Sequence, residues 1–423
     1  MNGKGVVPVY PPTAYEHFVT EYCDDFGFVV HGKRLKEGFV PPPVPEPCDP
    51  AVHAGAKLAL EAASGGRNTL LCDDLGLPSV MVRVPCFLWS DVMDGAPEVP
   101  CSAFVVGGKV LDCIYIGKYL NVVEHGRAYS LPARNPAGMY TLDEARAACA
   151  AKGKGWHLLT NAEWMALAFW AKKNGTLPRG NNAWGSDFLQ KHERGVTVDI
   201  GSFSGTMGEM PMRPVLTGTG PASWSHDGTP FGVYDMNGNL WDMVAGLRLN
   251  EGEIQIIPDN DSALNVDEGP KSDAWRAIRT DGTLVLPGSP GTYKYDGAEP
   301  GHADDAFVNL PAGVRLSTEV RQPQYFGIDS DRTHKAYSMF FFSDLTHEAS
   351  AAPNLLIKQL GLYPPTEEKS KTMFFVRNYA ERTPCRGGSW FDRETAGLWE
   401  LYLRDTRAWV AQDIGFRCAY VDV

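Results

Sequence analysis

The chain lacks the short motifs that mark many enzyme active sites. It has no H-E-x-x-H zinc motif, no G-x-S-x-G nucleophile turn, no Walker loop and no G-x-G-x-x-G turn before a helix. Its ten histidines are scattered, and none pairs at i, i+4 with another ligand type in a metal-like cluster. These absences argue against zinc peptidases, α/β-hydrolases, P-loop NTPases and dinucleotide-dependent enzymes.

Paired cysteines and long apolar runs are also missing. None of the nine cysteines has C-x-x-C spacing, and the odd count in a long chain does not indicate a disulfide framework. A reducing compartment at synthesis therefore fits best. No stretch approaches 18 apolar residues, and the first residues, MNGKGVVPVYPPTAYEHF, lack the pattern of a signal peptide. We expect synthesis in a cytoplasm, no signal peptide and no membrane insertion.

The sequence has fewer basic than acidic residues. Lys and Arg together number 39 against 51 Asp and Glu, for a formal net charge of −12. Binding a phosphate backbone requires concentrated Lys and Arg, so nucleic acid is not the expected partner. The length of 423 residues predicts two or three domains, and 44 Gly with 31 Pro predict many turns.

The residue composition of the chain changes near Pro78. Residues 1–77 are predicted to form an N-terminal module or arm, with a proline-rich spacer at 40–50 and a short helix at 51–63. Beyond Pro78, β-rich runs contain a Gly-Gly turn that predicts a hairpin. Helices are predicted at 141–153 and 160–175, because each begins with Thr followed three residues later by Glu, which is a capping box.

The segment YDMNGNLWD, residues 234–242, requires a tight turn at Asn-Gly-Asn. Asp235 and Asp242 flank this turn and supply hard oxygen ligands that could meet at one Ca²⁺ ion. In the alternative interpretation, the two carboxylates accept backbone N–H groups and only stabilise the turn. Ca²⁺ at Asp235 and Asp242 is thus the one cofactor that the sequence suggests.

Three ordered segments resemble a known family: YTLDEARAACAAKGKGWHLLTNAEWMALAFW, FGVYDMNGNLWDMV and RGGSW…IGFRCAY. They are similar to the formylglycine-generating-enzyme/sulfatase-modifying-factor family, a branch of the C-type lectin fold. The resemblance covers residues 78–423. It implies an α+β domain with two helices, a small antiparallel sheet and long ordered loops, in which residues 250–371 form an insert-like region.

The catalytic members of the family that this chain resembles are copper-dependent oxidases, and the chain departs from their pattern. Those members carry a cysteine pair soon after the GGS motif, where this chain has Trp390 and residues 391–393, with no cysteine between Cys385 and Cys418. The related iron branch takes its histidines from another domain, and no such cluster occurs in residues 1–77. We therefore expect no enzyme activity; the alternative is an oxidase of the formylglycine-generating or nonheme-iron type.

The tail, residues 386–417, resembles the variable region of diversity-generating-retroelement proteins, such as phage receptor-binding proteins and adhesins. In that group a reverse transcriptase rewrites the codons of one short cassette held in a constant frame. The frame predicted here consists of Gly387, Gly388, Trp390, Trp399, Gly415, Phe416 and Arg417. The resemblance implies a non-enzymatic protein that is virion-associated in a phage tail or reaches a cell surface by another route, with a protein or glycan receptor as partner.

Residue parity within LWELYLRD divides the central strand into two faces. Trp399, Leu401 and Leu403 share one side and are predicted to face the core, whereas Glu400, Tyr402 and Arg404 are predicted to be exposed. The predicted ligand-binding set comprises Phe391, Asp392, Arg393, Glu394, Glu400, Tyr402, Arg404, Asp405, Trp409, Val410, Gln412 and Asp413. Exposed aromatics beside charges are typical of binding surfaces. Replacing Tyr402 and Trp409 by Ala is accordingly expected to abolish binding and barely alter thermal stability.

A third hypothesis is a virion structural protein whose tail packs against a neighbouring subunit. A tail buried in a symmetric oligomer would favour it, and homo-oligomerisation is left open by the sequence.

Overall fold

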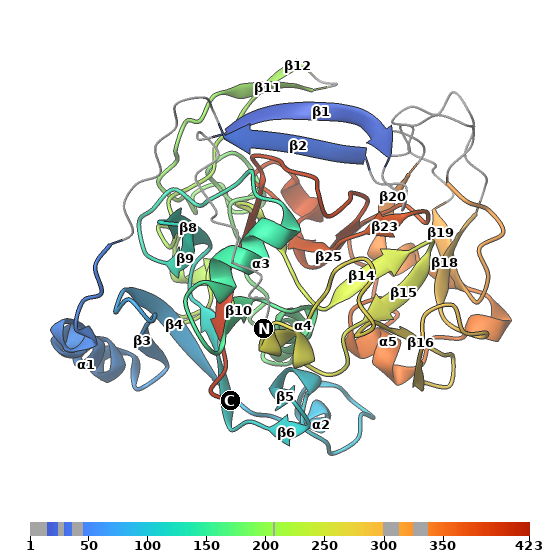
Figure 1. Ribbon diagram of the computed structural model, residues 1–423, viewed down its shortest axis with the longest axis horizontal. Coiled ribbons are helices and arrows are strands. Elements are labelled where there is room, and N and C mark those ends of the chain that lie inside the picture. The colour runs from blue at the N-terminus through green and yellow to red at the C-terminus, as the bar shows by residue number, and fades with distance from the viewer. Residues whose placement is uncertain (1–14, 24–28, 36–44, 206–207, 299–312, 325–336) are drawn as a thin grey trace, which may run out of the picture.

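The computed structural model describes residues 15–23, 29–35, 45–205, 208–298, 313–324 and 337–423. Part of the proline-rich spacer predicted at 40–50 and part of the insert-like region lie outside the described residues. Within the described ranges the chain mixes helices with several sheets, and the fold is α+β as expected (Figure 1). No helix in these ranges is both long and apolar enough to cross a bilayer.

A five-stranded sheet brings strands from residues 68–158 together with the last strand of the chain. Its order is β10 (Trp156–Leu158), β27 (Cys418–Tyr420), β7 (Cys113–Gly117), β4 (Pro78–Pro85) and β3 (Asn68–Cys72). β3 and β4 pair antiparallel from Asn68 opposite Val82 to Cys72 opposite Pro78. The domain boundary expected at residue 78 therefore falls within the β3–β4 hairpin. Strands from both sides of this boundary belong to the same sheet.

The two expected helices are α3 (Leu142–Ala150) and α4 (Asn161–Lys173). Both begin with the expected capping box: Thr141 accepts from the Glu144 backbone N–H, and Thr160 accepts from the Glu163 backbone N–H. α4 is almost entirely buried and contributes much of the largest hydrophobic cluster.

The two-helix description is incomplete. The described residues also contain α1 (Ala54–Ser64), α2 (Trp89–Val92) and α5 (Leu355–Gln359). α1 matches the helix predicted at 51–63 and ends at Gly65, whose φ of 61° is left-handed. α2 and α5 are single turns, too short to show helical periodicity in the sequence.

A six-stranded sheet holds the C-terminal segment. Its order is β20 (Ser338–Phe341), β22 (Met373–Val376), β25 (Gly397–Leu403), β24 (Cys385–Gly387), β13 (Trp241–Met243) and β26 (Ile414–Phe416). β25 lies in the interior of this sheet, parallel to β22 and antiparallel to β24. β26 runs parallel to β13, so the end of the chain is tied to the strand that follows the Asn-Gly-Asn turn.

The insert-like region supplies most strands of an eight-stranded sheet, which β14 (Leu247–Asn250) and β23 (Glu381–Arg382) complete from its two flanks. The other strands of the sheet are β15 (Glu253–Ile256), β16 (Arg276–Ile278), β17 (Leu284–Val285), β18 (Lys294–Gly297), β19 (Val314–Ser317) and β21 (Thr346–His347). The hydrophobic cluster on this sheet includes Leu401 and Leu403 of β25. The insert therefore shares a core with the C-terminal segment.

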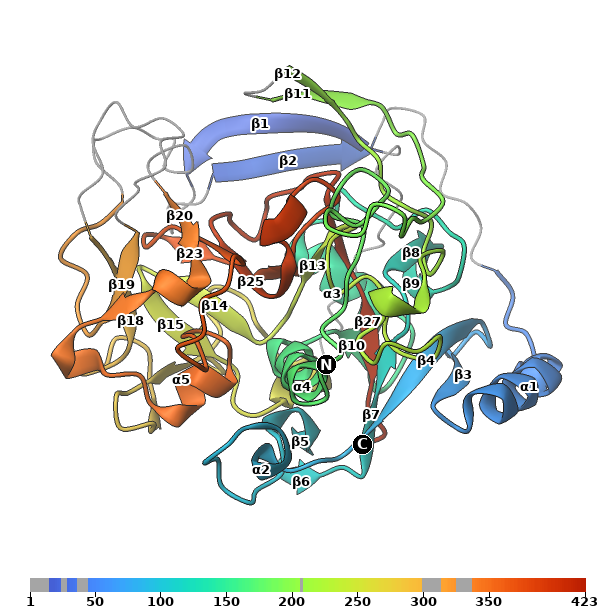
Figure 2. The same ribbon diagram turned by 180° about the vertical axis from the view of Figure 1, so that it is seen from behind.

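Four two-stranded hairpins complete the described structure: β1 (Tyr15–Cys23) with β2 (Val29–Leu35), β5 (Val105–Val106) with β6 (Lys109–Val110), β8 (Asn121–Glu124) with β9 (Arg127–Ser130), and β11 (Ser202–Gly205) with β12 (Gly208–Pro211). β5 and β6 form the hairpin predicted from the Gly-Gly turn. The β1–β2 and β11–β12 hairpins lie together at the end of the molecule that also carries the loops of the C-terminal segment (Figures 1 and 2).

Candidate functional site

The start of the C-terminal segment is fixed by backbone contacts with the Asn-Gly-Asn turn. The Gly238 N–H donates to the Gly387 carbonyl at 2.9 Å, and the Trp390 N–H donates to the Asn239 carbonyl at 2.9 Å. Gly387 has a φ of 91°, and a Cβ there would lie 2.9 Å from Trp164 Cη2, so glycine is required on both grounds. Trp390 is 1% exposed and lies in the core, as expected for a frame residue.

The other end of the frame is held by a buried ion pair. The Arg417 guanidinium donates from Nε and Nη2 to Asp242 Oδ2, at 3.0 and 2.7 Å, and both residues are fully buried. Arg417 Nη1 also donates to the Tyr234 carbonyl at 2.9 Å. The charged partner that the structure gives to Asp242 is thus the guanidinium of Arg417, which lies between β26 and β27 and is distant in sequence.

Asp235 lies beside this pair, and its backbone carbonyl accepts from Arg417 Nη2 at 3.3 Å. Burial raises the pKa of Asp235 to about 7, and the positive charge of Arg417 acts against that rise. Among the residues that the structure describes, no group of three or more His, Cys, Asp or Glu could hold a metal ion. Ca²⁺ at Asp235 and Asp242 stays a prediction, and such an ion would compete with Arg417 for Asp242.

The predicted exposure of Glu400 and Tyr402 is wrong. Glu400 is 0% exposed and Tyr402 is 8% exposed. The Tyr402 ring packs against Trp241 and Phe375, with ring centroids 5.2 and 5.3 Å away, and its hydroxyl donates to Asp405. The parity argument assumed one solvent-facing side, but β25 is an inner strand with both of its faces covered.

Trp399, predicted to face the core, is only partly buried. Its ring packs edge-on against Phe169 of α4, with centroids 5.0 Å apart. Leu401 and Leu403, on the same side of β25, are fully buried. Trp399 is therefore the one residue of β25 that is only partly buried.

The carboxyl group of Glu400 is buried without a counter-charge. Within the described structure, neither of its oxygens has a hydrogen-bond partner. Burial, and next the charge of Asp392, raise the pKa of Glu400 well above its ordinary value, and the nearby backbone N–H of Gly397 acts in the opposite direction. Burial therefore favours the neutral, protonated form of Glu400.

Two further carboxyl groups of the segment have raised pKa values. Burial raises the pKa of Asp392 to about 7, while hydrogen bonds from the Ser389 N–H and hydroxyl, at 2.7 and 2.9 Å, oppose the rise. Burial also raises the pKa of Asp413 to about 6, against the nearby charge of Arg404. These groups change charge within the physiological pH range.

The more exposed residues of the predicted binding set lie in two loops, not on the strand. Arg393, Glu394 and Gln412 are exposed, whereas Phe391, Asp392, Arg404, Asp405, Trp409, Val410 and Asp413 are partly buried. The Arg393 guanidinium lies 5.3 Å from the Trp184 ring centroid, and Glu394 pairs with Lys371 at 2.9 Å. We name these loops, residues 391–396 and 404–413, the display loops.

The eight cysteines from Cys48 to Cys418 are all free. Cys385 and Cys418, which flank the segment, are both buried, at 6% and 0% exposure. Burial raises the pKa of the Cys385 thiol well above its ordinary value. Neither thiol is placed at the surface near the display loops.

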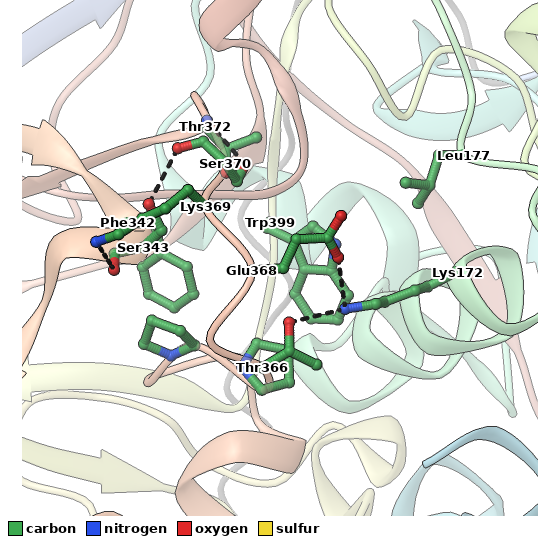
Figure 3. Close-up of a pocket in the computed structure, with 12 residues that line it drawn as sticks. Lys172, Leu177, Phe342, Ser343, Thr366, Glu368, Lys369, Ser370, Thr372 and Trp399 are labelled. Atoms are coloured by element: carbon green, nitrogen blue, oxygen red, sulfur yellow. Dashed lines mark hydrogen bonds and ion pairs between the residues drawn. The ribbon is translucent and has the colours of Figure 1, made fainter. Parts of the chain in front are cut away.

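A cavity of about 220 Å³ opens beside Trp399 (Figure 3). Its walls come from the end of α4, from residues 342–343 and from the loop at residues 364–372, and they include Lys172, Phe342, Thr366, Glu368, Ser370 and Trp399. Sequence reasoning missed this cavity, because its walls are contributed by segments far apart in the chain. The only sequence signal was the unusual position of Trp399 in the predicted variable segment.

Residues 120–266 match the family model of the sulfatase-modifying factor enzyme 1-like domain. The matched range contains α3, α4 and the Asn-Gly-Asn turn. This part of the chain is therefore similar to a sulfatase-modifying-factor domain, in agreement with the resemblance seen in the sequence. The display loops and the cavity-lining loop at 364–372 lie outside the match. No curated protein matches the chain.

Proposed function

We propose that this protein is a non-enzymatic binding protein. It displays a variable surface, the display loops, on a C-type lectin scaffold of the sulfatase-modifying-factor type, and it recognises a protein or glycan on a target cell. The cassette is diversified by a retroelement, and the protein is encoded by a phage or prophage.

The proposal rests on the difference in burial between two groups of residues within 386–417. The frame residues Trp390, Phe416 and Arg417 are buried and bonded to the rest of the core, whereas Arg393, Glu394 and Gln412 project from loops. A rigid frame with changeable loops permits new specificity without a new fold. Partly exposed Phe391 and Trp409 would supply apolar contact area.

An oxidase of the formylglycine-generating or nonheme-iron type is the second candidate, favoured by the family match at residues 120–266. Against it stands the missing cysteine pair after the GGS motif. The two candidates separate in one assay. Conversion of a peptide cysteine to formylglycine, or stoichiometric copper or iron in the purified protein, would establish the oxidase and overturn the binding proposal.

The binding proposal is tested with fluorescently labelled protein on a panel of bacterial cells. A variant with Ala at Phe391, Arg393, Glu394, Trp409 and Gln412 should fold normally and lose cell binding. A matched variant with Ala at five exposed positions elsewhere, Leu58, Val110, Leu189, Leu264 and Leu286, should bind like the parent. Equal binding by both variants would show that the display loops are not the recognition surface.

A genomic observation tests the diversification part separately. The proposal requires a near-copy of the segment's coding sequence, differing mainly at adenines, beside a reverse-transcriptase gene. A tail buried in a symmetric oligomer would instead support a virion structural protein.

A further inference from the structure

The cavity beside Trp399 combines a flat aromatic wall with hydrogen-bonding groups. Lys172 Nζ lies 5.7 Å from the centroid of the Trp399 ring, so the ammonium group borders the indole. The same Nζ donates to Thr366 Oγ1 at 3.1 Å and lies 3.9 Å from Glu368 Oε2. Figure 3 shows Lys172, Thr366 and Glu368 gathered around Trp399.

The charges in the walls are already compensated within the protein. Lys172 is paired with Glu368, and Lys369 donates to Asp344 Oδ1 at 2.6 Å. A strongly charged ligand would have to compete with these internal partners. The cavity therefore has no excess charge to attract an ion, and a neutral ligand fits its electrostatics best.

The wall groups still have hydrogen-bonding capacity. An ammonium group carries three donors, of which Lys172 directs one to Thr366 and one towards Glu368. The Thr366 hydroxyl accepts from Lys172 and keeps its own O–H to donate, and Glu368 has further lone pairs. A purely apolar ligand would remove these groups from water without replacing their hydrogen bonds, which is unfavourable.

We propose that this cavity binds one neutral pyranose ring of a glycan. The apolar C–H face of the sugar stacks on Trp399, and its hydroxyls exchange hydrogen bonds with Lys172, Thr366 and Glu368. The cavity volume is about 220 Å³, larger than the cavity of about 150 Å³ that holds a six-membered benzene ring in another protein. The inference rests on the proposed function in one respect: the glycan is part of the target that the display loops recognise.

The direct test measures binding of methyl glycosides of glucose, galactose, mannose and N-acetylglucosamine by saturation-transfer NMR and calorimetry. We expect at least one to bind with a Kd on the order of 1 mM, since a single small ring makes few contacts. Thr366→Trp, at the exposed lip of the cavity, should fill it and weaken binding more than tenfold. Lys172→Met, which keeps the aliphatic stem, should weaken binding about three- to tenfold.

Thr346→Trp is the matched control, because Thr346 is exposed on β21 and does not line the cavity. It should leave sugar binding unchanged, and all three variants should keep the melting temperature of the parent. The proposal is overturned if no glycoside binds, if Thr366→Trp binds as the parent does, or if indole binds in place of the sugars.

Failure here is distinguishable from failure of the proposed function. If no sugar binds, but the parent protein binds cells and the five-alanine variant does not, the proposed binding function stands and only the sugar site is rejected. If sugars bind at the cavity, but the five-alanine variant binds cells as the parent does, the sugar site stands and the role of the display loops is rejected.

Discussion

Two fully buried carboxylates lie in the same six-stranded sheet and have opposite surroundings. Asp242 on β13 receives two hydrogen bonds from the Arg417 guanidinium. Glu400 on β25 lies beside another acid, Asp392, and its oxygens have no hydrogen-bond partner within the described structure. Burial raises the pKa of both carboxyl groups, but only at Asp242 does a paired cation oppose it.

The difference separates the frame from the rest of the C-terminal segment. A buried ion pair with well-aligned hydrogen bonds positions two strands relative to each other, and removing one partner leaves an uncompensated charge. A buried carboxyl group without a partner remains neutral instead, and its neutrality depends on pH. The Arg417–Asp242 pair at the end of the segment therefore stabilises the fold, whereas the charge of Glu400, in the middle of the segment, depends on pH.

The largest expected effect is at the paired site. Arg417→Met should lower the free energy of unfolding by about 3–5 kcal/mol, because Asp242 is left buried and unpaired. Denaturant titration followed by circular dichroism measures this loss. Adding Asp242→Asn to Arg417→Met should restore part of the stability. A loss below about 1 kcal/mol for the single variant would contradict the structural role of the pair.

Tyr402→Ala is expected to cost about 3–5 kcal/mol, because it removes a buried ring from between Trp241 and Phe375. Trp409→Ala should cost less than half as much, since Trp409 is partly exposed. The buried position of Tyr402 thus replaces the sequence-based expectation that the double variant barely changes stability. Tyr402→Phe, which loses only the hydroxyl contact with Asp405, should cost about 1 kcal/mol. Equal losses for Tyr402→Ala and Trp409→Ala would show that the two sites are not different.

The raised pKa values of three carboxyl groups should make the stability fall as the pH rises from about 4 to about 7. Glu400, Asp392 and Asp413 have raised pKa values in the folded state, so the folded protein binds more protons than the unfolded chain above about pH 4. Their contribution is fully present below their unfolded pKa values and is lost as the pH passes about 6 and 7 at Asp413 and Asp392. Each group contributes at most about 1.4 kcal/mol per pH unit.

Glu400→Gln should flatten this pH profile, because the amide mimics the neutral acid and cannot ionise. Thermal unfolding of the parent and the variant at pH 5, 6, 7 and 8 provides the measurement. Parallel profiles for the two proteins would mean that Glu400 does not titrate differently in the folded state.

Small effects are expected in the display loops. Arg393 has a left-handed φ of 58°, so Arg393→Gly should relieve strain and stabilise the protein by about 1 kcal/mol. Glu394→Ala, which breaks an exposed pair with Lys371, should change stability by less than about 0.5 kcal/mol. A large loss from Glu394→Ala would place this loop among the elements that the fold requires.

Helices α3 and α4 could be predicted because their signals are local. Thr141 and Thr160 are followed three residues later by glutamates, and the capping boxes form as expected. The hairpin at Gly107-Gly108 and the tight turn at Asn237-Gly238 depend on equally local backbone preferences. α2 and α5 could not be predicted, since a single turn has no periodicity to detect.

The candidate site was predicted only in part. The burial of Trp390, Phe416 and Arg417 follows from their motifs, but the burial of Glu400 and Tyr402 does not. Alternation along a strand separates its two faces and does not reveal whether a second layer covers the outer one. β25 is covered on both faces: Leu401 and Leu403 share a hydrophobic cluster with the eight-stranded sheet, and Tyr402 shares a different cluster with residues of α3.

The sequence by itself determined the α+β class, the two capped helices, the tight turns and the motifs that begin and end the C-terminal segment. Each of these depends on residues within a few positions of one another. Only the tertiary structure decided that Arg417 pairs with Asp242, 175 residues away, and that Trp399 borders a cavity. It also decided that Glu400 has no hydrogen-bond partner among the residues that the structure describes. These features depend on which distant segments meet, and local preferences carry no information about that.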